Sequence, residues 1–489
     1  MKRRISVIGA GFSGMSAAAF LAHQGMDVTV YEKNSSPGGR AGIMRTEGFT
    51  FDLGPSWYWM PDVFESFFEQ FGKKVSDYYQ LERLDPAYRV FFGKDDFIDI
   101  PAGEEKVCGL FDSIEPGSAA QLKKFLDDGR YKYELGLKKL AYKPSLSVWE
   151  FLEPWLFKAL FRMDFMHSVT QKVRSRFTDP RLIQMLEFPV LFLGAKPSQT
   201  PAIYTLMNYA DLVLGTWYPA GGMHAVAQGF YKLALEENVK FMFNSPVSKI
   251  LLEEDSVRGL LVNGQELECD MVLSTADYHF TEMELLDASH RSYSEKYWDE
   301  RTMAPSALLF YLGLNKRVKG LQHHNLFFDE DFGRHAGEIY DSPQWPTRPA
   351  MYVSCSSKTD HSVAPEGHEN LIVLIPVAPG LQDDEEIRKR YFGLFLERME
   401  KLTGEKIAQS VVSMHSYACS DFVREYNSFK GNAYGLANTL RQTAVFKPSL
   451  KSRKSKNLFY AGQLTVPGPG IPPCIISGQI AATEMLKRI

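Results

Sequence analysis

The chain has 489 residues, of which 45% are hydrophobic and 23% charged, and its 55 basic and 59 acidic side chains give a net charge of −4. At roughly 100–200 residues per domain this length predicts several domains, and the composition excludes a disordered or fibrous chain and a short binding module. The nearly balanced charge also argues against nucleic-acid binding. Five scattered cysteines with no metal-ligand spacing predict neither a disulfide framework nor a metal site, and favour a reducing cytoplasm.

The N-terminal segment predicts a complete βαβ nucleotide-binding unit. Its parts are a strand over Ile5–Ile8, the glycines Gly9, Gly11 and Gly14, a helix over Met15–Gln24, and a strand over Val28–Tyr31 that ends at Glu32. Gly9 permits a tight turn, Gly11 lets the backbone approach a pyrophosphate, and Gly14 allows helix and strand to pack closely. Glu32 is placed to accept hydrogen bonds from ribose hydroxyls. A basic tip before an apolar run is also the pattern of a secretory signal, which is the alternative interpretation.

The next stretch favours a second contact with a diphosphate. Lys33 leads to Gly38-Gly39-Arg40, and Ala41–Asp52 alternates like a hairpin before Gly54-Pro55. Two glycines followed by a fixed positive charge suit an anion, whereas a plain turn with a solvated arginine is the alternative.

The segment Trp149–Arg181 differs in character from the rest of the chain. It crowds tryptophan, phenylalanine and leucine around Pro154, and from Trp155 onward it holds six basic and two acidic side chains. No run of about 20 apolar residues occurs anywhere, so a membrane span is excluded. Apolar bulk with local positive charge predicts a helical region that dips into an anionic bilayer surface, and a helix packed on the core is the alternative.

The remaining elements alternate between helix and strand. We expect helices over Met223–Glu236 and Ile475–Lys487 and strands over Lys240–Phe243, Val247–Leu252, Arg258–Val262, Met271–Ser274 and Asn457–Gly462. The final strand runs through Gly462 into a Gly/Pro-rich loop before the last helix, whose start can stabilise negative charge. His323-His324 is interpreted as a polar turn or edge pair.

Together these motifs resemble the FAD-dependent amine oxidase and desaturase superfamily, and within it the bacterial phytoene-type carotenoid desaturases. The resemblance extends over almost the whole chain and includes Phe51-Asp52-Leu53-Gly54-Pro55-Ser56, Trp217–Met223 and Tyr460–Pro472. It implies an α/β fold: a Rossmann-like FAD-binding domain (1–75, 217–285, 441–489), a discontinuous mixed α/β substrate domain (76–148, 286–440), and a helical membrane-associating region (149–216).

The resemblance also implies the cofactor-binding residues. Glu32 would bind the adenosine ribose, Arg40 the diphosphate and Val247 the adenine side, while Gly462, Ile471 and Pro472 would line the flavin. The full set expected to bind FAD is Gly9, Gly11, Gly14, Glu32, Lys33, Gly39, Arg40, Gly54, Pro55, Ser56, Val247, Gly462, Ile471 and Pro472.

Two departures from the family pattern bear on catalysis. Gln463 stands where many members have an acid, and Val148-Trp149-Glu150 follows Ser147 where desaturases have an Arg-Asp pair. An essential arginine is therefore doubtful at that position, and Glu150 is the best candidate for acid–base catalysis. A salt-bridged or mouth-lining role for Glu150 is equally open.

The expected function is FAD-dependent desaturation of a C40 carotenoid, either phytoene or a later and possibly 1′-hydroxylated carotene. Transfer of a hydride to flavin N5 with loss of a proton from the adjacent carbon needs no activated nucleophile, and no such constellation is found. A single dinucleotide motif favours oxygen or a membrane quinone as electron acceptor. We expect a cytoplasmic protein peripherally bound to the cytoplasmic membrane. The alternatives are a flavin oxidase or saturase acting on another lipid, an amine or a porphyrinogen, and a non-catalytic prenyl-lipid-binding protein of the same fold.

Overall fold

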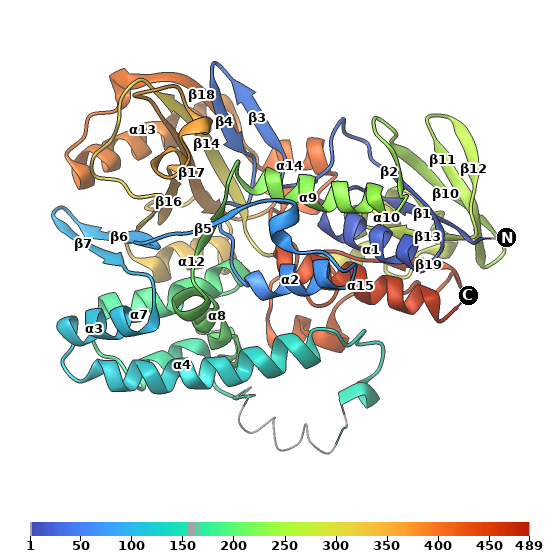
Figure 1. Ribbon diagram of the computed structural model, residues 1–489, viewed down its shortest axis with the longest axis horizontal. Coiled ribbons are helices and arrows are strands. Elements are labelled where there is room, and N and C mark those ends of the chain that lie inside the picture. The colour runs from blue at the N-terminus through green and yellow to red at the C-terminus, as the bar shows by residue number, and fades with distance from the viewer. Residues whose placement is uncertain (1, 152, 154–162, 165, 489) are drawn as a thin grey trace.

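The structure is a computed structural model that describes residues 2–151, 153, 163–164 and 166–488. Part of the segment predicted to associate with membranes therefore lies outside the described residues. The described chain forms a parallel sheet with its helices, a large mixed sheet, and a layer of helices below the large sheet in the view of Figure 1.

The parallel sheet has the strand order β19-β13-β1-β2-β9 and brings together strands from distant parts of the sequence. Its strands are β1 (Arg4–Ile8), β2 (Asp27–Tyr31), β9 (Lys240–Met242), β13 (Met271–Ser274) and β19 (Leu458–Tyr460). The predicted strands here are confirmed to within two residues at each end.

Three helices cover this sheet: α1 (Phe12–His23), α9 (Met223–Glu236) and α15 (Ile471–Leu486). Small side chains permit their close packing. A Cβ on Gly14 would lie 2.0 Å from the carbonyl oxygen of Gly9, and a Cβ on Gly478 would lie 2.3 Å from that of Ser13. Glycine at these positions therefore sets the distance between strand and helix and between α1 and α15.

Smaller sheets lie beside the parallel sheet and its helices. The antiparallel β10 (Val247–Glu253), β11 (Ser256–Val262) and β12 (Gln265–Glu268) form one of them. Asn263 and Gly264 connect β11 to β12 with φ of 48° and 78°, as a two-residue hairpin turn requires. The hairpin predicted over Ala41–Asp52 is confirmed as β3 (Ile43–Thr46) and β4 (Phe49–Asp52).

The large sheet has the order β18-β14-β17-β16-β15-β6-β7 and is antiparallel except where β15 meets β6. Its strands are β6 (Tyr88–Gly93), β7 (Asp96–Ile100), β14 (Ser306–Leu314), β15 (His324–Phe327), β16 (Met351–Ser354), β17 (Glu369–Val377) and β18 (Val411–Tyr417). Every residue of β14 is buried, and α13 (Glu385–Thr403) packs against the sheet through Tyr391, Phe395 and Met399.

The prediction of a polar turn or edge pair at His323-His324 is wrong. Both side chains are buried, and β15 lies inside the sheet. The His324 ring stacks on Trp57 at 4.1 Å between centroids, and its Nδ1 lies 2.7 Å from the hydroxyl of Tyr352. Burial lowers the pKa of both histidines, so they are neutral.

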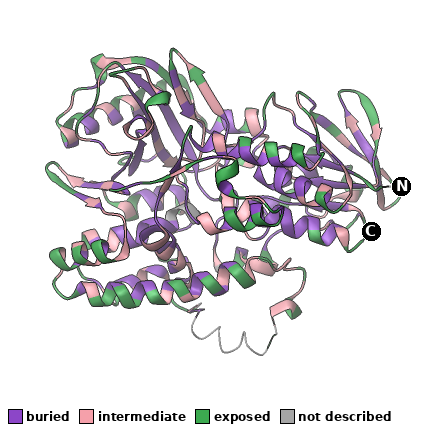
Figure 2. Cartoon of the chain, viewed as in Figure 1, coloured by how far each residue is buried: buried purple, intermediate pink, exposed green. Residues whose placement is uncertain are grey.

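The helical layer contains α3 (Glu104–Ile114), α4 (Ser118–Leu135), α6 (Val169–Arg174), α7 (Pro180–Glu187) and α8 (Leu206–Tyr209). Figure 2 shows α4 with alternating buried and exposed surface, as expected for a helix that covers a core on one side. None of the helices in the described residues is long and apolar enough to cross a bilayer.

Candidate active site

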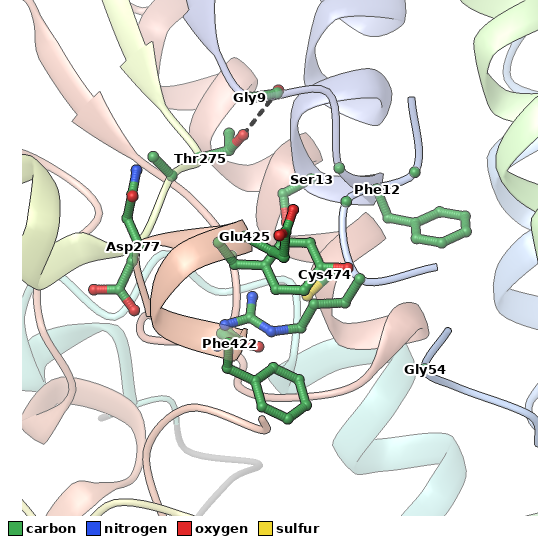
Figure 3. Close-up of a pocket in the computed structure, with 18 of the residues that line it drawn as sticks. Gly9, Phe12, Ser13, Gly54, Thr275, Asp277, Phe422, Glu425 and Cys474 are labelled. Carbon is green, nitrogen blue, oxygen red and sulfur yellow. Dashed lines mark hydrogen bonds between the residues drawn. The ribbon is translucent and has the colours of Figure 1, made fainter. Parts of the chain in front are cut away.

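A cavity of about 470 Å³, here called the cofactor cavity, opens at the carboxyl ends of β1, β2 and β13. Its walls come from both ends of the chain and from α14 (Cys419–Tyr426), and Figure 3 shows Asp277, Phe422, Glu425 and Cys474 among the residues that line it. It brings together eleven of the predicted cofactor residues, which are Gly9, Gly11, Glu32, Lys33, Gly39, Arg40, Gly54, Pro55, Val247, Gly462 and Ile471.

The glycine-rich turn leaves space where a cofactor must approach the backbone. Gly9 has φ of 99°, a conformation that favours glycine, and its carbonyl accepts a hydrogen bond from Thr275 Oγ1 (3.1 Å; Figure 3). No atom lies within 4 Å of the position that a Cβ on Gly11 would occupy. Gly11 therefore borders open cavity, as a site for a pyrophosphate requires, whereas Gly14 serves the packing of α1 on β1 and does not line the cavity.

Glu32 is fixed in place at the end of β2. Its side chain is buried, Oε2 accepts a hydrogen bond from the backbone N–H of Ala10 (2.7 Å), and Oε1 accepts one from that of Asn34 (2.9 Å). Each carboxylate oxygen has further acceptor capacity. Glu32 is therefore oriented to receive donors from the cavity, as the ribose hydroxyls of a dinucleotide would supply.

Two cations complete this half of the cavity. Lys33 Nζ donates to the carbonyl of Arg424 (2.9 Å) and to Asn427 Oδ1 (3.2 Å), which ties β2 to the end of α14. Arg40 Nη2 donates to Ser428 Oγ (3.0 Å), while its buried Nε has no hydrogen-bond partner within the protein. A buried N–H without a partner in a cavity wall suits a phosphate oxygen, so the residues present fit a diphosphate.

The C-terminal end of the cavity is a helix start. Helix α15 begins at Ile471, four residues before the predicted start, because Pro472 and Pro473 lie in its first turn, where the proline's missing N–H costs no hydrogen bond. The helix dipole there favours negative charge. Gln463 also lines the cavity and donates to Asn432 Oδ1 (3.2 Å), so it links the loop after Gly462 to a neighbouring segment.

Several residues that line the cofactor cavity were not predicted from the sequence. Thr275 and Asp277 follow β13 just as Glu32 follows β2, so the rule that ligands bind at the carboxyl ends of parallel strands could have found them. The Asp277 carboxylate is buried, which raises its pKa, and it accepts a hydrogen bond from the backbone of Phe429. No pattern in the neighbouring sequence marked Tyr426 on α14 as a wall residue. In the structure the Arg40 guanidinium lies 5.3 Å from its ring centroid.

A second cavity of about 250 Å³, here called the apolar cavity, adjoins the first. Its walls are mostly aromatic and aliphatic, and they include Trp57, Trp59 and Phe328. The two cavities share Gly54, Pro55, Leu374, Tyr434, Gly470 and Ile471. The predicted residues Ser56 and Pro472 line the apolar cavity, not the cofactor cavity.

Glu150 lies apart from both cavities. It belongs to the short 3₁₀ helix η3 (Val148–Phe151), and its carboxylate accepts the backbone N–H groups of Ser145, Leu146 and Ser147 at 2.8–3.0 Å. It is not among the lining residues of either cavity. Its role as an acid–base catalyst stays a prediction.

Comparisons with known proteins agree with this architecture. Residues 12–486 match the family of flavin containing amine oxidoreductases. The chain is 40% identical to a carotenoid 3,4-desaturase of Haloarcula japonica (99% of this chain and 98% of that protein) and 34% identical to a zeta-carotene-forming phytoene desaturase of Myxococcus xanthus (99% and 94%).

Solved structures with a similar fold are more distant. A putrescine oxidase bound to putrescine has a TM-score of 0.64 at 14% identity, with each chain covered completely, and a Rab GDI of Plasmodium falciparum has 0.57 at 12% identity, with 99% of this chain and 98% of that chain covered. The family match and the carotenoid desaturase relatives confirm the resemblance seen in the sequence. The chain therefore belongs to the flavin-containing amine oxidoreductase family, and it is an FAD-dependent oxidoreductase.

Proposed function

We propose that the protein desaturates a C40 carotenoid, oxidising a CH–CH bond to C=C. The observation that carries this proposal is the apolar cavity that shares six wall residues with the cofactor cavity. A hydrocarbon chain is bound by apolar contacts alone, and such a wall offers them beside the cofactor. The two relatives above are named as carotenoid desaturases, which supports the same substrate class.

The bound FAD would supply the redox chemistry by accepting the two electrons removed from the substrate. The residues of this chain would then bind, orient and exclude water. Gly11, Glu32 and Arg40 would hold the nucleotide half of FAD, and the residues around Gly462 and Ile471 its flavin half. Trp57, Trp59 and Phe328 would hold the substrate chain in the apolar cavity, so that one of its bonds lies at the junction with the cofactor cavity.

Anaerobic reduction of the flavin tests this function directly. Flavin-loaded protein mixed without oxygen with a carotene in liposomes should lose its oxidised-flavin absorption and yield a carotene with one more double bond. Putrescine and protoporphyrinogen serve as competing substrates. Reduction by either of them, with none by phytoene, neurosporene, lycopene or a 1-hydroxylated carotene, would reject carotenoid desaturation.

We also infer that the protein binds peripherally to the cytoplasmic membrane. Apolar side chains are exposed on both sides of the undescribed stretch: Val148 is 57% exposed, Trp149 77% and Met166 92%. Insertion of such side chains into a bilayer is favourable, and nearby lysines would strengthen binding to anionic lipid.

Flotation with anionic and neutral vesicles tests membrane binding. The double substitution Trp149→Ser and Met166→Ser should reduce flotation several-fold. Met242→Ser is the matched control, because Met242 is 49% exposed and belongs to β9, the edge strand of the parallel sheet. Equal flotation of both variants would contradict the proposal.

Electron transfer from the reduced cofactor to oxygen or a membrane quinone completes the proposed cycle. Mixing reduced protein rapidly with oxygen or with a short-chain quinone, and measuring the return of oxidised-flavin absorption, compares the two acceptors. An acceptor that reoxidises the flavin more slowly than turnover is excluded.

A further inference from the structure

A third cavity, here called the polar cavity, continues the line formed by the first two. It has a volume of about 490 Å³ and shares Phe188, Phe328, Phe332 and Ala336 with the apolar cavity. These four residues, here called the partition, separate the two spaces. The order is therefore cofactor cavity, apolar cavity, partition and polar cavity.

The partition consists of side chains from three elements. Phe188 follows α7, Phe328 follows β15, and Phe332 and Ala336 belong to α12 (Phe332–Tyr340). Figure 1 shows α7 and α12 beside each other below the large sheet. The rings of Phe188 and Phe328 are in contact, with centroids 5.8 Å apart. Aromatic side chains can rotate about their side-chain torsions without breaking a hydrogen bond, so they make a wall that a ligand can open.

The apolar cavity is too small for the proposed substrate. A cavity of about 150 Å³ holds a benzene molecule, so 250 Å³ holds on the order of ten carbon atoms. A C40 chain that reaches the junction with the cofactor cavity must therefore extend beyond the apolar cavity.

The walls of the polar cavity carry charged side chains, unlike the walls of the apolar cavity. The polar cavity is lined by Arg174 and Glu187, which form an ion pair at 3.4 Å, and by Lys196, which pairs with Asp341. These charges are already paired, so they do not call for a charged ligand. Their presence indicates a hydrated space in which a chain end meets water.

We propose that the substrate chain crosses the partition, with the reacting bond at the cofactor and the distal part in the polar cavity, so that Phe188, Phe328, Phe332 and Ala336 determine which chain ends are accepted. This inference rests on the proposed function. It assigns the four residues to specificity, because an opening bordered by these side chains admits a linear isoprenoid end more readily than a bulkier one.

Closing the partition provides the first test. Ala336→Phe should weaken binding of a linear C40 carotene at least 10-fold, measured by the perturbation of flavin absorption, and leave binding of a ten-carbon isoprenoid hydrocarbon within twofold. Ala350→Phe is the matched control, because Ala350 lines the apolar cavity but not the polar cavity. This control should weaken both ligands. If Ala336→Phe leaves C40 binding intact, or weakens both ligands equally, the proposal is wrong.

Opening the partition provides a second test that does not depend on tolerance of a larger side chain. Phe332→Ala should increase at least fivefold the kcat/KM for a carotene that ends in a six-membered ring, relative to a linear carotene. Phe327→Ala, at a buried phenylalanine that lines neither cavity, should leave this ratio unchanged. An unchanged ratio in Phe332→Ala overturns the proposal even when the wild type desaturates the linear carotene, whereas an inactive wild type would refute the proposed function itself.

Discussion

The burial of Lys447 predicts how far the stability of the folded protein changes with pH. Its side chain is buried, and its Nζ has no hydrogen-bond partner. The Nζ and the amide oxygen of Asn438, also without a partner, lie 3.3 Å and 3.2 Å from the point where a Cβ on Gly468 would stand. Both side chains thus pack against the loop that leads to the start of α15. Burial lowers the pKa of Lys447 from 10.5 to about 7.

The sign of the pH dependence follows from this shift. Between pH 7 and 10.5 the unfolded chain holds a proton on Lys447 that the folded chain has lost, so stability rises with pH across this window. Below pH 7 both states are protonated, and the folded state carries the full cost of the buried charge. Each pH unit is equivalent to about 1.4 kcal/mol, so between pH 7 and pH 9 this cost falls by about 3 kcal/mol.

Lys447→Met removes the charge and keeps most of the side-chain volume. We expect the variant to exceed the wild type in stability at pH 6 and this advantage to be about 3 kcal/mol smaller at pH 9, visible as a change of a few °C in the difference between their thermal midpoints. Lys454→Met is the control, since Lys454 is exposed in a nearby loop. The burial of a charged Lys447 would be refuted if the stability difference between variant and wild type were the same at pH 6 and pH 9. It would also be refuted if the variant were less stable than the wild type at pH 6.

Three further substitutions test the cofactor site and the candidate base. Gly14→Val should abolish folding or flavin binding, because its Cβ would lie 2.0 Å from a carbonyl oxygen; recovery of normal flavin content from purified protein would contradict this packing. Glu32→Gln should weaken FAD binding roughly 10-fold, measured by titration of apoprotein, since a charged acceptor becomes a neutral amide. Glu150→Gln should slow anaerobic flavin reduction about 10²-fold or more if this carboxylate accepts the departing proton, whereas a near-normal rate would leave it the structural role of binding the turn at 145–147.

The βαβ unit could be predicted because its signals are local. Strand, glycines, helix and Glu32 follow one another within a short stretch, and each has a specific physical role there. The same holds for α9 and β13, whose predicted bounds agree with the structure. Contacts of Arg40 with Ser428 and Tyr426 could not be predicted, because they join residues almost 400 positions apart through the packing of α14.

His324 shows why polarity alone misplaces a residue. A histidine pair suggests a wet surface when only neighbouring residues are considered. Its actual surroundings are Trp57, which stacks on the ring, and Tyr352, whose hydroxyl lies 2.7 Å from Nδ1 and also 2.7 Å from Ser56 Oγ. These partners lie on separate strands and loops, so the surroundings of His324 arise only in the folded chain.

The position of the apolar cavity follows from how the two sheets are connected. Gly54 and Pro55 lie just after β4, Leu374 lies in β17 of the large sheet, and Gly470 and Ile471 are at the start of α15. The walls shared by the two cavities thus come from the nucleotide-binding half and from the large sheet together. Neither half alone could hold a hydrocarbon against the cofactor, so the repeated crossing of the chain between them creates the junction at which a substrate bond can meet the flavin.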